Sequence, residues 1–524
     1  MKKFVKLVGL LLVVFLASGC NKSYIGSPAN SEQSARKMYA EAPLASAPPM
    51  TSGLINNQLS VNGGVFDSGL AELPVVNAEK YNDYEENVFL NVTEQPVTTF
   101  SVDADGASYS NMRRFLHFGQ LPPKASVRIE EYINYFTFNY AEPAGDDNIA
   151  LNSELVTCPW EEKHHLLRLG IKGKTIPDAI LPNSNYVFLI DVSGSMSSPD
   201  KLELLKNGFK QMIDNLRDRD RVAIVTYAGN AGVLLQSTYC DEKKKIKNAI
   251  DKLGASGSTA GAEGIKTAYE IAAKNFIQNG NNRVILGSDG DFNVGISSTE
   301  ELVKLIEEKR KSGIYLTVLG VGTGNLNDNM MEQIANKGNG NYEYIDNINQ
   351  IQKVFVHEKS KFYTVAKDCK IQIKFNHNKV QAYRLIGYEN RALANEDFEK
   401  DEIDAGEIGS SQTITALYEV ILTSENSKEP FAEFSVRYKF PNEEQSRLLN
   451  LPIQSQPINI WNASEDTRFA ASVAGFGMIM KQSKYKGTLT KNMITELSNN
   501  AASFDQNGYK KEFIQLVTKS PNPQ

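Results

Sequence analysis

The sequence predicts an α/β protein with a doubly wound, mostly parallel six-stranded sheet inserted in, or clasped by, a β-sandwich and followed by a helical C-terminal region. Two observations predict this architecture. Between residues 184 and 362, short apolar runs alternate with amphipathic segments, as strands and helices do in a doubly wound sheet. On both sides of that stretch, apolar and polar residues alternate with the period of two that is typical of strands. Segments distant in sequence are therefore expected to share a second β unit.

Residues 1–19 are expected to be a secretory signal peptide. Three lysines precede an apolar run at residues 7–17, which is short for a membrane span but suits the hydrophobic region of a signal. Small residues directly before Cys20 resemble the bacterial lipobox, after which this cysteine would become the lipidated, palmitate-bearing first residue. A plain signal peptide with an incidental cysteine is the alternative.

Residues 20–85 are expected to form a lipidated, flexible tether, because they are rich in small and polar residues and poor in large apolar ones. A tether of about 65 residues reaches on the order of 45 Å. Asn21 is not the aspartate that retains enteric lipoproteins in the inner membrane, so by analogy the outer membrane is favoured over the inner. The expected location is thus the bacterial cell envelope, with the leaflet open.

Charge and cysteine content exclude some functions. Removing the three lysines of the signal changes the formal charge from −6 to −9, which argues against nucleic acid and against a basic membrane-binding face. Cys158, Cys240 and Cys369 remain, and this scattered odd number indicates neither a disulfide framework nor a metal cluster. They are interpreted as small buried side chains, although one pair could form.

Residues 86–183 are expected to contain an N-terminal segment and the first strands of the β unit, at 149–156 and 165–171. Asp103, Asp105 and Gly106 fail the EF-hand spacing and are interpreted as a turn before a helix at 109–118. Within residues 184–362, further strands are expected at 221–227, 233–238, 314–320 and 341–345, and a closing helix at 348–362.

The buried strand expected at residues 186–190 leads directly into a candidate metal site. Its apolar run ends in Asp191, Ser193 and Ser195, at alternate positions around Gly194. The carboxyl ends of parallel strands form the ligand-binding edge of open α/β sheets. One carboxylate and two hydroxyls are hard oxygen ligands, which suit Mg²⁺ or Mn²⁺.

Two later stretches strengthen this interpretation. Thr259 stands in a small-residue loop before a helix, and Asp289 follows the strand-like residues 284–286. Together with D-x-S-x-S, they resemble the von Willebrand factor type A (VWA) domain and its metal-ion-dependent adhesion site, or MIDAS. The resemblance implies that a metal, Mg²⁺ or else Mn²⁺ or Ca²⁺, is held by Asp191, Ser193, Ser195, Thr259 and Asp289. A turn-rich nucleotide-type fold with solvated acidic loops is the other interpretation.

Residues 363–455 are expected to complete the β-sandwich, and residues 456–524 to be helical. Strands are expected at 369–375, 380–388, 413–422 and 432–440. The segments 97–140, 382–393 and 404–409 resemble the flanking regions of one family of bacterial VWA lipoproteins. Six acids are interpreted as a solvated connection, with a calcium-binding loop as the alternative: Glu396, Asp397, Asp401, Glu402, Asp404 and Glu407.

The leading hypothesis is a membrane-anchored envelope protein that binds an acidic residue of a partner protein through the metal. In the implied MIDAS, hydroxyls touch the ion and the aspartates act largely through water, so the ion keeps an open position for a partner's carboxylate. A structural or assembly scaffold with a stabilising metal is the second hypothesis. A metal-dependent hydrolase is the third hypothesis. It ranks last because no histidine has metal-ligand spacing and no serine lies in a G-x-S-x-G elbow. No catalytic residue is predicted.

Overall fold

The computed structural model describes residues 78–522, except 230, 258–260, 291–298, 424–428 and 455. Cys20, the signal and most of the tether lie outside the described residues, as does Thr259. All described residues belong to one unit, Glu72–Gln524.

The central sheet has the predicted doubly wound topology. Its strand order is β10-β9-β8-β5-β6-β7, and every neighbouring pair is parallel except β6 and the edge strand β7. The strands are β5 (Ser184–Asp191), β6 (Arg221–Tyr227), β7 (Ala231–Tyr239), β8 (Asn281–Ser288), β9 (Tyr315–Val321) and β10 (Tyr342–Ile345). β5 and β8 are buried throughout, which explains their continuous apolar runs.

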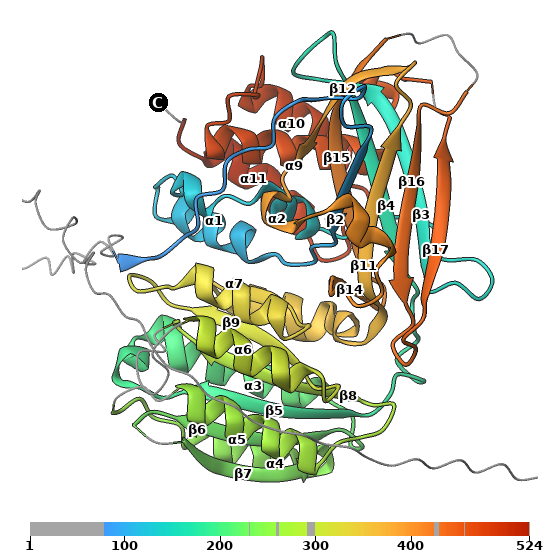
Figure 1. The fold of residues 1–524 in the computed structure, drawn as a ribbon. Helices are drawn as coiled ribbons and strands as arrows, with labels where there is room; N and C mark the ends of the chain where they lie inside the picture. Colours follow the sequence, from blue (N-terminus) through green and yellow to red (C-terminus); the bar gives the residue numbers. More distant parts are fainter. Residues whose placement is uncertain are drawn as a thin grey trace, which may run out of the picture. The chain divides into compact units, whose positions relative to one another are not determined.

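Helices cover both faces of this sheet (Figure 1). Alternate residues of β5 point to opposite sides, so Phe188 packs with Leu205 of α3, whereas Leu189 packs with Ile265 of α5. The helices are α3 (Leu204–Asn215), α4 (Lys243–Asp251) and α8 (Ile348–Gln352) on the first face, and α5 (Gly261–Lys274), α6 (Thr299–Arg310) and α7 (Asp328–Lys337) on the second.

A sandwich of two antiparallel sheets is assembled from segments on both sides of the central domain. The first sheet has the order β1 (Leu90–Asn91), β12 (Val380–Ile386), β15 (Thr413–Leu422), β4 (His165–Gly173) and β3 (Ile149–Thr157). The second has the order β13 (Ala392–Leu393), β2 (Val97–Ser101), β11 (Thr364–Phe375), β16 (Ala432–Lys439) and β17 (Ser446–Ile453), and β14 (Gly406–Gly409) pairs with β11. Because β4 pairs with β15 and β2 pairs with β11, the central domain is an insertion in the sandwich, as predicted.

A helical layer packs against the first sheet. It combines α1 (Ala107–His117) and α2 (Ile129–Asn134) with the C-terminal helices α9 (Glu465–Lys481), α10 (Lys491–Asn499) and α11 (Tyr509–Lys519), which lie beside them in Figure 1. Helix α9 is buried along almost its whole length, from Thr467 to Met480. Among the described residues, no helix combines the length and the apolar character that crossing a bilayer requires.

The predicted closing helix at 348–362 is wrong in detail. The α-helix ends at Gln352, and a π-helical turn (Lys353–His357) and a 3₁₀ turn (Lys359–Phe362) follow before β11 begins. Lys353 and Lys361 are drawn inward here to pair with Glu358 and Glu343. The short strands β1 and β2 and the edge strand β17 were not expected from the sequence.

Candidate metal centre

Asp191 is the last residue of β5 and is held in one orientation by two hydrogen bonds. The backbone N–H of Ser193 donates to Asp191 Oδ1 at 2.9 Å, and the hydroxyl of Ser288 donates to Asp191 Oδ2 at 3.0 Å. Burial raises the pKa of Asp191 to about 6, although the hydrogen bonds from Ser193 oppose the rise and the charge of Asp289 adds to it. The carboxylate is therefore a preorganised ligand that lacks a full counter-charge.

Ser193 and Ser195 turn their hydroxyls toward each other. The two Oγ atoms lie 3.0 Å apart, within a turn that begins directly after β5. The backbone N–H of Gly194 donates to the carbonyl of Gly257 at 3.0 Å, and the N–H of Ser256 donates to the carbonyl of Val192. These bonds join the serine turn to the loop that leads toward Thr259, which itself lies outside the described residues.

Asp289 follows β8, the strand that pairs with β5, and completes the described part of the site. Its Oδ2 accepts hydrogen bonds from Lys201 Nζ at 2.9 Å and from Asn325 Nδ2 at 3.0 Å. Burial favours the protonated form, but the Asn325 hydrogen bond and the Lys201 charge outweigh it, so the pKa of Asp289 is lowered; a Ser195 hydrogen bond contributes. The four described residues thus belong to a single polar network.

Lys201 is a residue that sequence reasoning missed. Its side chain is buried and packs against Gly322. A Cβ atom at position 322 would overlap Lys201 Cε, so the close contact requires glycine there. No local pattern marks Lys201, because its contact with Asp289 joins positions 88 residues apart. Ser288 was also missed, although a polar residue at the buried end of a strand was a usable signal.

The residues present fit a small divalent cation. Two hydroxyls and two buried carboxylates supply hard oxygens, and an ammonium group already lies against one of the carboxylates. Within the described part of the chain, no three or more histidine, cysteine, aspartate or glutamate side chains converge in a way that would hold a metal. A metal at this site would accordingly depend on the serine hydroxyls as well as on the two aspartates.

Comparison with known proteins agrees with this fold. Residues 185–357 match the von Willebrand factor type A domain, residues 75–168 match a family described as von Willebrand factor, and residues 360–522 match the C-terminal domain of YfbK. The "Uncharacterized protein YfbK" of Escherichia coli (strain K12) is 40% identical over 465 residues, which cover 84% of this chain and 80% of YfbK. The chain belongs to the YfbK family of VWA proteins.

Solved structures with a VWA fold also match. The von Willebrand factor type A protein from Catenulispora acidiphila is 15% identical, covers 74% of this chain and 94% of its own, and has a TM-score of 0.43. BatB from Bacteroides thetaiotaomicron is 24% identical, covers 34% of this chain and 98% of its own, and has a TM-score of 0.30. VWA domains are typically protein-interaction modules, many with a divalent metal, which gives the YfbK-family chain a binding role as its general class.

The other residues singled out in the sequence lie away from this site. Cys158, Cys240 and Cys369 are free and buried in three separate hydrophobic cores, so the expectation of small buried side chains is confirmed. Asp103 and Asp105 form ion pairs with Arg391 rather than a calcium loop.

The acids of residues 396–407 were interpreted as solvated, which does not hold for the Oε1 atom of Glu407, whereas Asp404 stays partly exposed. Asp404 pairs with Arg310 at 2.6 Å, and Glu407 Oε1 is buried. The contacts that decide this come from segments distant in sequence, such as Arg310 in α6, so only the tertiary structure reveals them.

Proposed function

We propose that this YfbK-family chain is a lipid-anchored envelope protein that binds an acidic residue of a partner protein through a divalent cation. The proposed ligands are Asp191, Ser193, Ser195, Thr259 and Asp289, and the cation is Mg²⁺ or Mn²⁺. The supporting observation is the polar network at the carboxyl ends of β5 and β8, in which the two serine hydroxyls lie 3.0 Å apart between two buried aspartates.

Residues of the chain have two different roles at this site: some orient a ligand, and others supply oxygen atoms to the cation. Ser288 and the Ser193 backbone orient Asp191, so its carboxylate loses little freedom when a cation arrives. Ser193 and Ser195 offer neutral oxygens. When bound, the cation supplies an electrophilic position that a carboxylate from outside can fill.

Metal binding is tested with MnCl₂ and the purified exported chain by isothermal titration calorimetry. Wild type is expected to bind one Mn²⁺, and Ser193→Ala to bind at least tenfold more weakly, since it removes one neutral ligand. Ser197→Ala is the matched control, because Ser197 is exposed in the same turn and should leave affinity unchanged. Equal affinity in all three proteins would refute the assigned ligands.

Capture of a carboxylate is tested on the Mn²⁺-loaded protein. A short aspartate-containing peptide should lower the water-proton relaxation enhancement of bound Mn²⁺, because a carboxylate would displace a water molecule. The same peptide with asparagine in place of aspartate is the control. If both peptides act alike, the metal does not recognise an acid, and a purely stabilising metal remains.

A further inference from the structure

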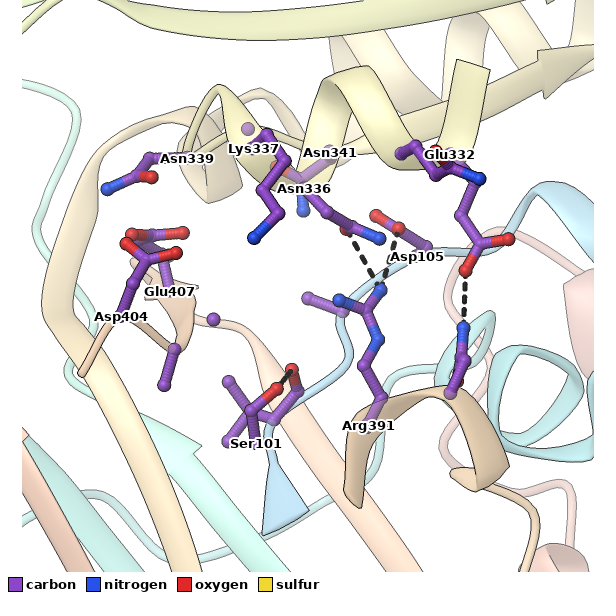
Figure 2. Close-up of a pocket in the computed structure, with 18 of the residues that line it drawn as sticks. Ser101, Asp105, Glu332, Asn336, Lys337, Asn339, Asn341, Arg391, Asp404 and Glu407 are labelled. Carbon is purple, nitrogen blue, oxygen red and sulfur yellow. Dashed lines mark hydrogen bonds and ion pairs between the residues drawn. The ribbon is translucent and has the colours of Figure 1, made fainter. Parts of the chain in front are cut away.

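A second polar site lies near the starts of β8 and β10, whereas the candidate metal centre lies at the carboxyl ends of β5 and β8. It is a cavity of about 280 Å³, lined by the end of α7 and the loop after it, by the segment after β2, and by the segments around β13 and β14 (Figure 2). Residues from the inserted domain and from the sandwich therefore share it. Its volume is just below the usual range of small-molecule pockets, so only a small ligand would fit.

One wall of this cavity is acidic. Figure 2 shows the carboxylates of Asp404 and Glu407 close together, facing the interior from the segment at β14. Asp404 has a partner, Arg310, at 2.6 Å. Glu407 is different, because its Oε1 is buried and has no hydrogen-bond partner among the described residues.

The environment of Glu407 opposes its charge. Burial raises its pKa well above the usual value, the carboxylates of Asp404 and Asp368 raise it further, and the charges of Arg310 and Arg283 offset only part of this. A buried carboxylate without a donor is costly, and a native protein retains one mainly where something else supplies the donor.

The basic side chains of the opposite wall already have partners. Arg391 donates to Asp103 at 2.8 Å and to Asn336 at 2.9 Å, and it pairs with Asp105 at 3.4 Å. Lys337 is half exposed and pairs with Glu307 at 3.2 Å. Arg283 also lines the cavity; both of its Nη atoms donate to neighbours, and only its Nε is buried without a partner. On the acidic wall, the unpartnered atom is the acceptor Glu407 Oε1, and a cationic donor would supply the partner it lacks.

A metal ion is a poor candidate for this partner, because no metal-holding group of three or more acidic, histidine or cysteine side chains occurs in the described ranges. We propose that the cavity binds a small molecule bearing a primary ammonium group, which forms ion-paired hydrogen bonds with Glu407 and Asp404. A primary ammonium has three N–H donors, enough to reach both carboxylates. The rest of such a ligand meets polar lining groups that suit hydroxyls or amides: Ser101, Asn336, Asn339 and Asn341.

The proposal is tested by calorimetry on the purified full chain with three amines of different origin, each beside an uncharged counterpart. The pairs are glucosamine with N-acetylglucosamine, putrescine with 1,4-butanediol, and glycinamide with N-acetylglycinamide, which separate an amino sugar, a diamine and a peptide-like amine. At least one amine should bind, at least tenfold more tightly than its counterpart, and equally well with chelator. If no amine binds more tightly than its counterpart, the proposal is wrong.

Variants locate the binding. Glu407→Gln keeps the shape of the side chain but removes its charge, and should weaken amine binding at least tenfold. Asp404→Asn is a second variant in the same wall and should also weaken it. Glu433→Gln, in an exposed position of β16, is the control and should bind as wild type does. Undiminished amine binding by both wall variants would overturn the proposal. The Mn²⁺ affinity of the same variants should equal that of wild type, which shows that the substitutions leave the candidate metal centre intact.

Discussion

At the scale of single residues, Lys201 is the cation that neighbours Asp289 in the proposed metal site. Its ammonium group lies 2.9 Å from Asp289 Oδ2, and both side chains are buried. An incoming cation must compete with this internal one for the same carboxylate. We therefore expect the pair to lower the affinity of the proposed site for metal and to stabilise the protein when metal is absent.

Lys201→Met is expected to bind Mn²⁺ about tenfold more tightly than wild type, corresponding to ~1.4 kcal/mol. It should also lose ~3 kcal/mol of unfolding free energy in chelator, since it leaves Asp289 buried without its counter-charge. Mn²⁺ should restore much of this loss. Calorimetry and urea denaturation measure the two effects.

Lys210→Met is the control, because Lys210 of α3 forms a solvent-exposed pair with Asp251 of α4. Its effect on stability should be small. An unaltered Mn²⁺ affinity in Lys201→Met would show that the lysine does not compete with the metal.

Glu130 of α2 makes stability depend on pH. Burial raises its pKa from 4.5 to about 8, and repulsion by Glu389 contributes. Between these two values the native state keeps a proton that the unfolded chain releases, so the free energy of unfolding falls as pH rises. The fall is at most ~1.4 kcal/mol per pH unit from this group.

Glu130→Gln should remove this part of the pH dependence. Relative to wild type, the variant gains stability steadily as pH rises from 4.5 to 8, and the difference between the two proteins stops changing below pH 4.5. Urea denaturation across this range measures the difference. Glu496→Gln, at an exposed position of α10, is the control, and its free energy of unfolding should depend on pH as that of wild type does. A constant offset between Glu130→Gln and wild type would contradict the assigned cause.

At the scale of elements, close backbone approach fixes how β10 joins the sheet. At Gly340, just before β10, a Cβ would overlap the carbonyl oxygen of Leu316 in β9. Gly340→Ala should therefore destabilise the protein by ~1–3 kcal/mol or more, because backbone rather than a flexible side chain must move. Gly254→Ala is the control, since nothing lies within 4 Å of its Cβ position. Equal urea midpoints for both variants would contradict this.

The same scale shows where local patterns suffice. Strands β5 and β8 were predictable because burial on both faces produces continuous apolar runs, and α3 because its apolar residues recur at three and four positions. The break after Gln352 was not predictable. Its turns are held by Lys353 and Lys361, whose partners include Glu343 in β10, and helix propensity carries no information about such contacts.

At the scale of the whole molecule, we expect the proposed anchor at Cys20 to hold the chain at a membrane. Cys20→Ser should abolish incorporation of radiolabelled palmitate and move the protein from the membrane fraction to the soluble fraction, because a lipid anchor supplies most of the membrane affinity. Cys158→Ser is the control, as Cys158 is free and buried. Retention of Cys20→Ser in the membrane fraction would contradict the anchor.

The sequence by itself determined the alternation of strands and helices and the insertion between two strand-rich segments, because strand and helix periodicity is written in neighbouring positions. The metal-ligand set stays a prediction that rests on a family resemblance. Only the tertiary structure decided that Lys201 reaches Asp289 and that the Oε1 atom of Glu407 is buried beside a cavity. Burial and ion pairing are set by which distant segments pack together, and a residue's neighbours in sequence carry little record of that packing.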